Sequence, residues 1–207
     1  MTEREHIAGV LLAGGLARRM GGGDKCLRLL AGRPILGHVL GRVRPQVGPL
    51  LLNAHGDAAR FAEFGLTVAQ DVVDGHAGPL AGILTGMEWA AEHAPECRWL
   101  ASFATDAPFL PGDLVARLMR AVEEESAKVA RAASNGRAHP VFALWPVALA
   151  GELRKALVGE DIRKIDAFTA RYKVATVEFA TEPHDPFFNA NRPEDFAEAE
   201  GLFAARS

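Results

Sequence analysis

Residues 7–25 read IAGVLLAGGLARRMGGGDK, an apolar run followed directly by a glycine-rich segment with three cations. The run at 7–13 is too apolar to alternate between two faces, which is typical of a strand covered on both sides. Glycines after such a strand let the backbone bring its N–H groups close to an anion, and Arg18, Arg19 and Lys25 add positive charge there. The stretch therefore predicts an α/β fold with a phosphate site after its first strand.

Neither standard phosphate fingerprint fits this segment. A P-loop ends in Gly-Lys followed by Ser or Thr, whereas Asp24, Lys25 and Cys26 follow the last glycine here. The dinucleotide fingerprint needs glycines at positions i, i+2 and i+5, and the segment has no such set. An alternative is a surface loop with solvated charges, but the strand, the double glycine and the cations together favour a phosphate site of a different design.

Outward from this stretch, short apolar runs alternate with segments of helical periodicity. This alternation predicts a mainly parallel sheet covered by helices on both faces. In the first half the expected strands are 7–13, 50–52, 66–69 and 99–104, and the expected helices are 34–44, 80–94 and 111–125. In the less regular second half the expected strands are 128–132, 139–145 and 174–179, and the expected helices are 147–157, 162–172 and 193–205.

Length and composition narrow the class of protein. The chain has 207 residues and a formal net charge of -3, which is typical of one domain without a basic field for nucleic acid. Its two cysteines, Cys26 and Cys97, predict free thiols in a reducing compartment. The N-terminus lacks a signal-peptide pattern, and no apolar run reaches the ~18 residues of a membrane span. We therefore expect a cytoplasmic protein that binds neither nucleic acid nor membrane.

Polar residues follow three further expected strands. Asn53, Asp71 and Asp106 come just after the second, third and fourth strands of the first half. The carboxyl ends of parallel strands share one edge, where α/β sheets bind ligands, so these side chains are expected to converge on the glycine segment. Asp106 is a candidate Mg²⁺ ligand, since Mg²⁺ takes one or two carboxylates plus substrate phosphates. Taken singly, each of the three is explained as well by a turn or a helix cap.

Two further segments combine glycines or asparagines with the expected start of a helix. GPLAGILTG (78–86) places glycines at the start of a helix, where they serve either a ligand or close packing of the helix on the sheet. FFNANRPED (187–195) places Asn189 and Asn191 before the last helix, where Asn191 either caps the helix or faces a ligand with Asn189. Both segments leave the two interpretations open.

Together these segments resemble the molybdenum cofactor guanylyltransferases, within the wider nucleotidyltransferase family. The resemblance rests on LAGGLARRMGGGDK (12–25), GPLAGILTG (78–86), TDAPFLP (105–111), HPVFALWP (139–146) and FFNANRPEDF (187–196). It implies a single domain over residues 1–207 with a Rossmann-like three-layer α/β/α fold and a mainly parallel sheet. The N-terminal half would hold GTP and Mg²⁺, and the C-terminal half would hold molybdopterin.

The resemblance also implies a reaction and a set of residues. GMP passes from GTP to the terminal phosphate of molybdenum-molybdopterin, pyrophosphate leaves, and Mg²⁺ is the cofactor. The implied GTP contacts are Leu12, Ala13, Gly14, Gly15, Lys25, Asn53, Asp71, Gly78, Gly82 and Asp106. Arg19, Lys25 and Asp106 are the implied catalytic residues, with Asp106 as metal ligand. Gly22, Asn189 and Asn191 match other functional positions, the two asparagines on the side of the second substrate.

Several choices stay open at this stage. Guanine presents N–H donors on its pairing edge, and Asp71, Asn53 or backbone carbonyls could accept from them. Residues that could hold the second substrate are Arg137, His139, Arg163, Lys164, His184 and Arg192. Rival functions are cytidylyl transfer, transfer to a sugar or alcohol phosphate, and a non-catalytic adaptor that carries nucleotide or cofactor. The chain is expected to act as a monomer, with transient contacts to proteins that deliver molybdopterin or mature molybdoenzymes.

Overall fold

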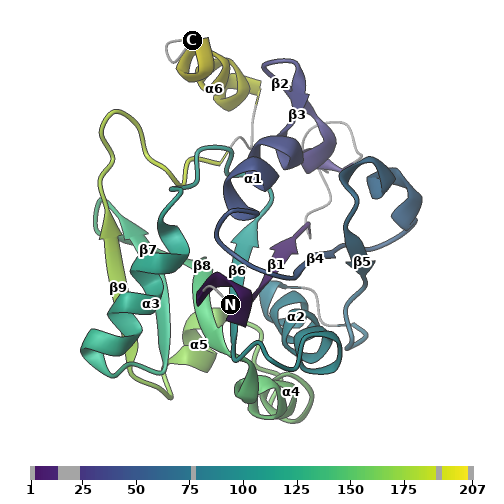
Figure 1. The fold of residues 1–207 in the computed structure, drawn as a ribbon, viewed down its shortest axis with the longest axis vertical. Coiled ribbons are helices and arrows are strands. Elements are labelled where there is room, and N and C mark those ends of the chain that lie inside the picture. The colour runs from purple at the N-terminus through teal and green to yellow at the C-terminus, as the bar shows by residue number, and fades with distance from the viewer. Residues whose placement is uncertain (1–2, 14–23, 76–77, 190–192, 205–207) are drawn as a thin grey trace.

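A seven-stranded sheet forms the centre of the structure, with strand β1 (Ile7–Leu12) inside it (Figure 1). The computed structural model describes residues 3–13, 24–75, 78–189 and 193–204. The strand order is β5-β4-β1-β6-β8-β7-β9. The other strands are β4 (Leu50–Asn53), β5 (Thr67–Ala69), β6 (Trp99–Ala104), β7 (Val129–Ser134), β8 (Arg137–Pro146) and β9 (Val174–Phe179).

The sheet is parallel except at β8. Strand β1 pairs in parallel with β4 and β6, β4 with β5, and β7 with β9, whereas β8 runs antiparallel to both β6 and β7. The carboxyl ends of β5, β4, β1 and β6 therefore meet at one edge, and the N-terminal end of β8 lies at the same edge. This confirms the predicted mainly parallel sheet and the common edge for residues that follow its strands.

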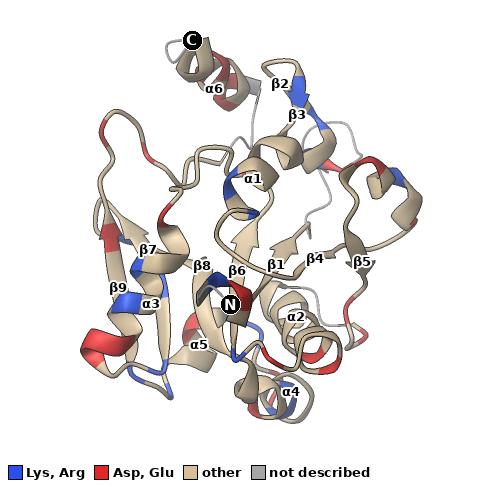
Figure 2. Ribbon diagram, viewed as in Figure 1, with Lys and Arg blue, Asp and Glu red and all other residues tan. Residues whose placement is uncertain are grey.

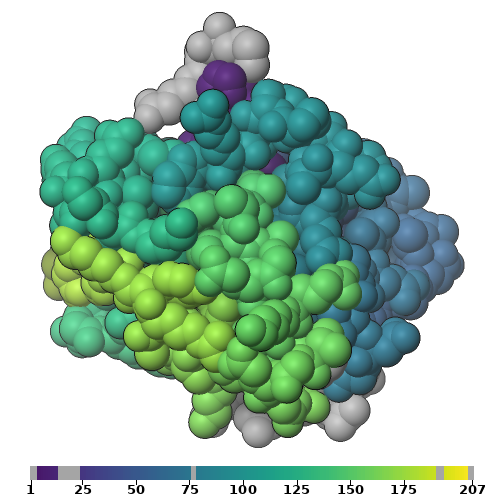
Figure 3. Space-filling model, turned by 90° about the horizontal axis from the view of Figure 1, so that it is seen from below, coloured from purple at the N-terminus to yellow at the C-terminus, as the bar shows by residue number. Residues whose placement is uncertain are grey.

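Helices cover both faces, which explains why all six residues of β1 are buried (Figure 1). One face carries α1 (Ile35–Val43), α3 (Leu114–Glu125) and α6 (Pro193–Ala204). The other carries α2 (Pro79–His93), α4 (Ala150–Gly159) and α5 (Ile165–Thr169). Seen from below, the teal segment that includes α2 and the green segment that includes α4 form adjoining parts of one surface (Figure 3). The three layers agree with the predicted α/β/α arrangement.

Charged residues lie around this core rather than in it. The ribbons of β1, β4 and β6 carry no Lys, Arg, Asp or Glu, and the basic and acidic positions are distributed over the surrounding helices and loops (Figure 2). Within the described ranges, no helix is long and apolar enough to cross a membrane.

Several elements differ from the sequence-based expectation. A small hairpin pairs β2 (Leu29–Leu30) with β3 (Arg33–Pro34), and the 3-10 helix η4 (Ala58–Phe64) lies between two expected strands, where the sequence analysis placed no helix. The expected helix at 147–157 divides into the 3-10 helix η5 (Val147–Leu149) and α4. The expected helix at 162–172 shortens to α5, and Ile162 and Tyr172, which lie outside the helix, still pack against the core.

Candidate active site

A pocket of about 500 Å³ lies at the edge where the parallel strands end. Seven residues proposed from the sequence line it, namely Leu12, Ala13, Lys25, Asn53, Asp71, Gly78 and Asp106. Six others line it that the sequence did not single out as ligands, namely Cys26, His55, Pro79, Ala104, Thr105 and Val141. Gly14, Gly15, Arg19, Gly22 and Asn191 lie outside the described residues.

Lys25 and Asp106 form an ion pair in this pocket. Lys25 is the first residue of the 3-10 helix η3 (Lys25–Leu27), and Asp106 lies two residues after β6. The Lys25 Nζ atom is 2.7 Å from Asp106 Oδ2, and the two side chains are 14% and 26% exposed. Next to Asp106, the Thr105 hydroxyl donates to the carbonyl of Leu12 at 3.2 Å, which ties the end of β6 to the end of β1. The pair places one cation and one carboxylate together where the strands end.

Arg60 connects the Lys25 segment to the segment that follows β4. Its guanidinium forms an ion pair with Asp24, the neighbour of Lys25, and donates to the backbone carbonyls of His55 and Asp57. Guanidinium groups suit such bridging because they present several N–H donors in a rigid fork. Arg60 therefore holds the two loops that carry Lys25 and His55 in one arrangement.

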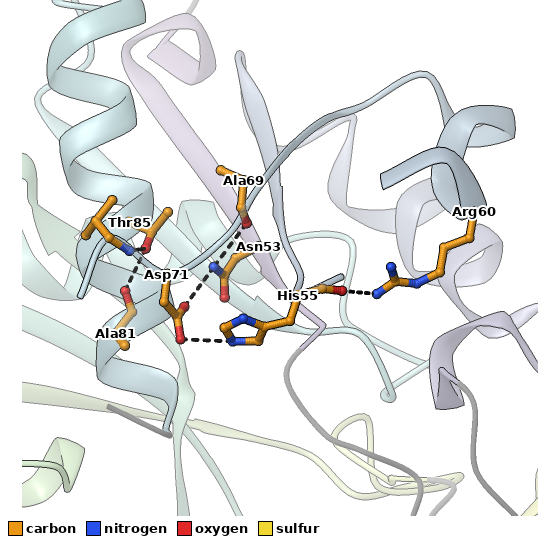
Figure 4. Close-up of polar contacts among 8 residues, drawn as sticks. Asn53, His55, Arg60, Ala69, Asp71, Ala81 and Thr85 are labelled. Carbon is orange, nitrogen blue, oxygen red and sulfur yellow. Dashed lines mark hydrogen bonds and ion pairs between the residues drawn. The ribbon is translucent and has the colours of Figure 1, made fainter. Parts of the chain in front are cut away.

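Asp71 is the centre of a second polar group at the pocket (Figure 4). Its Oδ1 accepts a hydrogen bond from Asn53 Nδ2 at 3.0 Å, and its Oδ2 lies 3.1 Å from His55 Nε2. The residue after Asp71 is also fixed, since the backbone N–H of Val72 donates to the Thr85 hydroxyl of α2 at 3.1 Å. The Asp71 carboxylate is thus oriented by donors from residues at and just after the end of β4. The backbone next to Asp71 is anchored to the helix α2.

Gly82 lies beneath Asn53 rather than among the lining residues of the pocket. A Cβ atom at Gly82 would stand 2.3 Å from Asn53 Oδ1 and 2.6 Å from Leu12 Cδ2. The sequence proposed Gly82 as a GTP contact and left close packing as the alternative; the structure shows this packing, and the contact with GTP stays a prediction. Gly78, by contrast, lines the pocket and has a φ of 147°, which side-chain-bearing residues rarely adopt.

Cys26 offers the pocket a thiol but not a nucleophile. Burial, followed by the negative charge of Asp24, raises the pKa of Cys26 to about 11. The thiolate is the reactive form of cysteine, so this side chain stays protonated and unreactive at neutral pH. Cys26 therefore lines the pocket without offering it a thiolate.

A separate polar cluster lies at the end of β7 and the start of β8. The Ser134 Oγ atom is 2.7 Å from His139 Nε2, and the Ser134 hydroxyl is 3.0 Å from Asp185 Oδ1, to which it donates. Asp185 Oδ1 also accepts from the backbone N–H of Phe187 at 2.9 Å. Burial lowers the pKa of His139. The cluster fixes the start of the segment that leads to Asn189, whose Oδ1 is buried without a hydrogen-bond partner among the described residues.

The other residues considered for a second substrate are dispersed. Arg163 pairs with Asp161 at 2.8 Å, and its backbone carbonyl lies beside Gly78 at the pocket. Arg137 and Lys164 are exposed, His184 packs against Phe109 with ring centroids 4.7 Å apart, and Arg192 lies outside the described residues. Arg163 is thus the member of this set that the fold brings next to the pocket.

His55 is a polar side chain of the pocket that the sequence analysis did not name. It stands two residues after Asn53, and residues so spaced in an extended segment face the same side. That spacing could have indicated that His55 lies on the same side as Asn53. The sequence alone does not show that the chain stays extended beyond β4.

Nearly the whole chain is similar in sequence to known proteins. Residues 9–176 match the model of a family described as a MobA-like NTP transferase domain. A molybdenum cofactor guanylyltransferase from Bradyrhizobium sp. (strain ORS 278) is 61% identical over 198 residues, which cover 96% of this chain and 93% of that protein. A protein of the same name from Rhodopseudomonas palustris (strain BisB5) is 57% identical, with 98% of this chain and 96% of that protein covered.

Solved structures show the same fold at lower identity. Molybdopterin-guanine dinucleotide biosynthesis protein A from Archaeoglobus fulgidus has a TM-score of 0.72 and 23% identity, and 96% of this chain and 99% of that chain are covered. The 4-diphosphocytidyl-2C-methyl-D-erythritol synthase from Anaerococcus prevotii has a TM-score of 0.73 and 13% identity, with coverage of 98% and 97%. These likenesses confirm the Rossmann-like nucleotidyltransferase fold.

Proposed function

Because the chain belongs to the molybdenum cofactor guanylyltransferases of the MobA-like NTP transferase family, we propose that its pocket binds GTP for guanylyl transfer. GMP passes to the terminal phosphate of molybdenum-molybdopterin, pyrophosphate leaves, and the guanine dinucleotide form of the cofactor results. The observation that carries the proposal is the convergence of Lys25, Asp106 and Asp71 on one pocket at the end of a parallel sheet.

The chemistry of the pocket suits this reaction. Nucleotidyl transfer needs alignment and charge neutralisation rather than a protein nucleophile, and the attacking group is already a phosphate anion. Lys25 would stabilise the charge that develops on the leaving pyrophosphate, together with Arg19, which lies outside the described residues. The backbone at Leu12 and Ala13 would contact GTP at the end of β1.

Asp106 is the residue that would hold Mg²⁺. Among the described residues, no three His, Cys, Asp or Glu side chains form a metal cluster. A single carboxylate nevertheless fits this metal, because Mg²⁺ is usually held by one or two carboxylates plus substrate phosphates. In the structure the Asp106 carboxylate has a cationic partner, the Lys25 ammonium group. When bound, the metal supplies charge neutralisation at the phosphates of GTP.

The C-terminal half would hold the second substrate. The buried Oδ1 of Asn189 lacks a partner among the described residues, and leaving a buried acceptor unsatisfied costs about 1–3 kcal/mol. A donor on molybdopterin would recover that free energy. The cluster of Ser134, His139 and Asp185 holds the segment before Asn189, and this supports a defined position for the amide.

The proposal includes a monomer that works in the cytoplasm. Cys26 and Cys97 are both free and buried, which supports a reducing compartment.

The decisive experiment incubates the full chain with Mg²⁺, molybdenum-molybdopterin and each nucleoside triphosphate in turn, and measures pyrophosphate release. We expect release with GTP and little with CTP. Release with CTP but not GTP would replace the proposal by cytidylyl transfer. GTP binding without pyrophosphate release, with molybdopterin and with sugar or alcohol phosphates, would support the adaptor function.

Arg60→Met should weaken GTP binding without removing any residue of the pocket. The methionine keeps an apolar stem but loses the guanidinium that joins Asp24 to the carbonyl of His55. We expect GTP affinity to fall about tenfold, since a hydrogen bond to a charged group is worth about 1.5–3 kcal/mol and 1.4 kcal/mol corresponds to tenfold. Isothermal titration calorimetry with GTP and Mg²⁺ measures the change.

Arg154→Met is the matched control for this prediction. Arg154 also pairs with a carboxylate, Glu88, at 2.6 Å, but neither residue lines the pocket. Equal GTP affinity in the Arg60 and Arg154 variants would show that the bridge does not organise the site.

A further inference from the structure

The carboxylate of Asp71 is held on both of its oxygens. Asn53 Nδ2 donates to Oδ1 at 3.0 Å, and His55 Nε2 is 3.1 Å from Oδ2 (Figure 4). An ionised carboxylate only accepts hydrogen bonds, so the Nε2 atom of His55 is the one that carries the proton. The Asp71 side chain is 10% exposed and that of His55 is 62% exposed, so the imidazole approaches the carboxylate from the solvent side. Rotation of the carboxylate would therefore break one or both of these hydrogen bonds.

The Asn53 side chain takes part in this arrangement and also packs against the helix α2. Its Nδ2 donates to the carbonyl of Ala69 at 3.3 Å as well as to Asp71, and its Oδ1 faces the position that a Cβ of Gly82 would occupy. At 5% exposure, Asn53 is buried by these contacts. Asp71 differs, because each carboxylate oxygen has two lone pairs and its neighbours in the network use one on each. Asp71 offers two such oxygens to a ligand in the pocket, whereas Asn53 offers a single amide oxygen that packs against Gly82.

We infer that His55 is a positioning residue that sets nucleotide specificity by fixing the Asp71 carboxylate toward the pairing edge of guanine. The inference rests on the proposed function and deepens it. Guanine offers two adjacent donors, N1–H and the 2-amino group, which match the two oxygens of a carboxylate. Cytosine and adenine each present one amino donor beside a ring-nitrogen acceptor, and that acceptor would face a carboxylate oxygen. The Asp71 carboxylate therefore favours guanine only while its neighbours keep both of its oxygens directed at the two donors of the base.

The arrangement is supported from the backbone side as well. Arg60 donates to the carbonyl of His55, and Val72, which follows Asp71, is anchored to Thr85 at 3.1 Å. The two residues whose side chains meet are thus held by separate elements, η4 and α2. This independence lets a change at His55 alter the orientation of the carboxylate without moving the backbone of Asp71.

The test compares GTP with inosine triphosphate (ITP), which lacks only the 2-amino group, in the wild-type chain and in His55→Ala. Dissociation constants are measured by calorimetry with Mg²⁺ and without the second substrate. The wild-type chain should prefer GTP to ITP by about tenfold or more, the worth of one hydrogen bond to a charged group. In His55→Ala the GTP affinity should fall about tenfold and the ITP affinity much less, so that the preference shrinks to about threefold or less.

Two variants control the interpretation. His55→Gln carries an Nε2 donor that can still reach Asp71, and it should restore most of the preference for GTP. His93→Ala removes another exposed histidine, near the end of α2 and outside the pocket lining, and should leave both affinities unchanged. Thermal melting should change little in all three variants, because both imidazoles are largely exposed.

The outcomes separate this inference from the proposed function. If the wild-type chain binds GTP and His55→Ala leaves the ratio of the GTP and ITP affinities unchanged, the inference is overturned and the proposed function stands. Failure of His55→Gln to restore the ratio would likewise overturn the hydrogen-bond role. A wild-type chain that does not bind GTP overturns the proposed function and the inference with it.

Discussion

Asp106→Ala is expected to reduce guanylyl transfer by about a thousandfold or more while the protein stays folded. The substitution removes the carboxylate proposed to hold Mg²⁺, and metal stabilisation of phosphate charge is worth several kcal/mol, at 1.36 kcal/mol for each factor of ten. The side chain is 26% exposed and pairs with Lys25 at the pocket, so its loss creates no large cavity in the core. Single-turnover pyrophosphate release at saturating GTP measures the rate, and circular dichroism checks the fold.

Two further variants make this prediction specific. Asp106→Asn keeps the size of the side chain but lacks the charge, so it should be almost as inactive as Asp106→Ala. Asp113→Asn removes a charge from the exposed residue before α3, outside the pocket lining, and should keep the wild-type rate. Binding of Mn²⁺ in the presence of GTP, followed by electron paramagnetic resonance, should weaken only in the Asp106 variants. A rate within tenfold of wild type in Asp106→Ala would exclude Asp106 as an essential residue.

The parallel core could be predicted because β1 and β6 are almost uninterrupted apolar runs. β6 and β9 have the bounds that the sequence indicated, Trp99–Ala104 and Val174–Phe179. The hairpin of β2 and β3 could not be predicted in this way, since strands of two residues show no periodicity. The antiparallel direction of β8 was also beyond the sequence analysis, because strand direction depends on long-range pairing with β6 and β7.

The location of the pocket was likewise predictable, whereas the roles of its residues were not. The rule that parallel strands end at a common edge placed Asn53, Asp71 and Asp106 together, and the structure confirms their convergence. It did not show that Asn53, while lining the pocket, would point its Oδ1 toward Gly82 and donate from its Nδ2 to Asp71. That distinction depends on packing between β4 and α2, which are far apart in the sequence and meet only in the folded chain.

Gly82→Ala should damage both stability and nucleotide binding through this packing. The added Cβ would lie 2.3 Å from Asn53 Oδ1 and 2.6 Å from Leu12 Cδ2, and both neighbours are buried. Relieving such an overlap typically costs about 1–3 kcal/mol, which for a chain of this size lowers the melting temperature by about 3–10 °C. Displacement of Asn53 would also remove a donor from Asp71, so GTP affinity should fall about tenfold or more. Differential scanning calorimetry and GTP titration measure the two effects.

Substitutions at two other glycines of the chain separate the effect on stability from the effect on GTP affinity. A Cβ at Gly86 would stand 2.8 Å from Val10 Cβ, so Gly86→Ala should lose similar stability, but its close neighbours do not line the pocket and GTP affinity should stay near wild type. Gly151 has open space in α4, so Gly151→Ala should be slightly stabilising, by about 0.5–1 kcal/mol. If the Gly82 and Gly86 variants lost GTP affinity equally, the loss would reflect general loosening of α2. A selective loss in Gly82→Ala would instead show that this buried glycine controls nucleotide binding through its packing against Asn53 and Leu12, which both line the pocket.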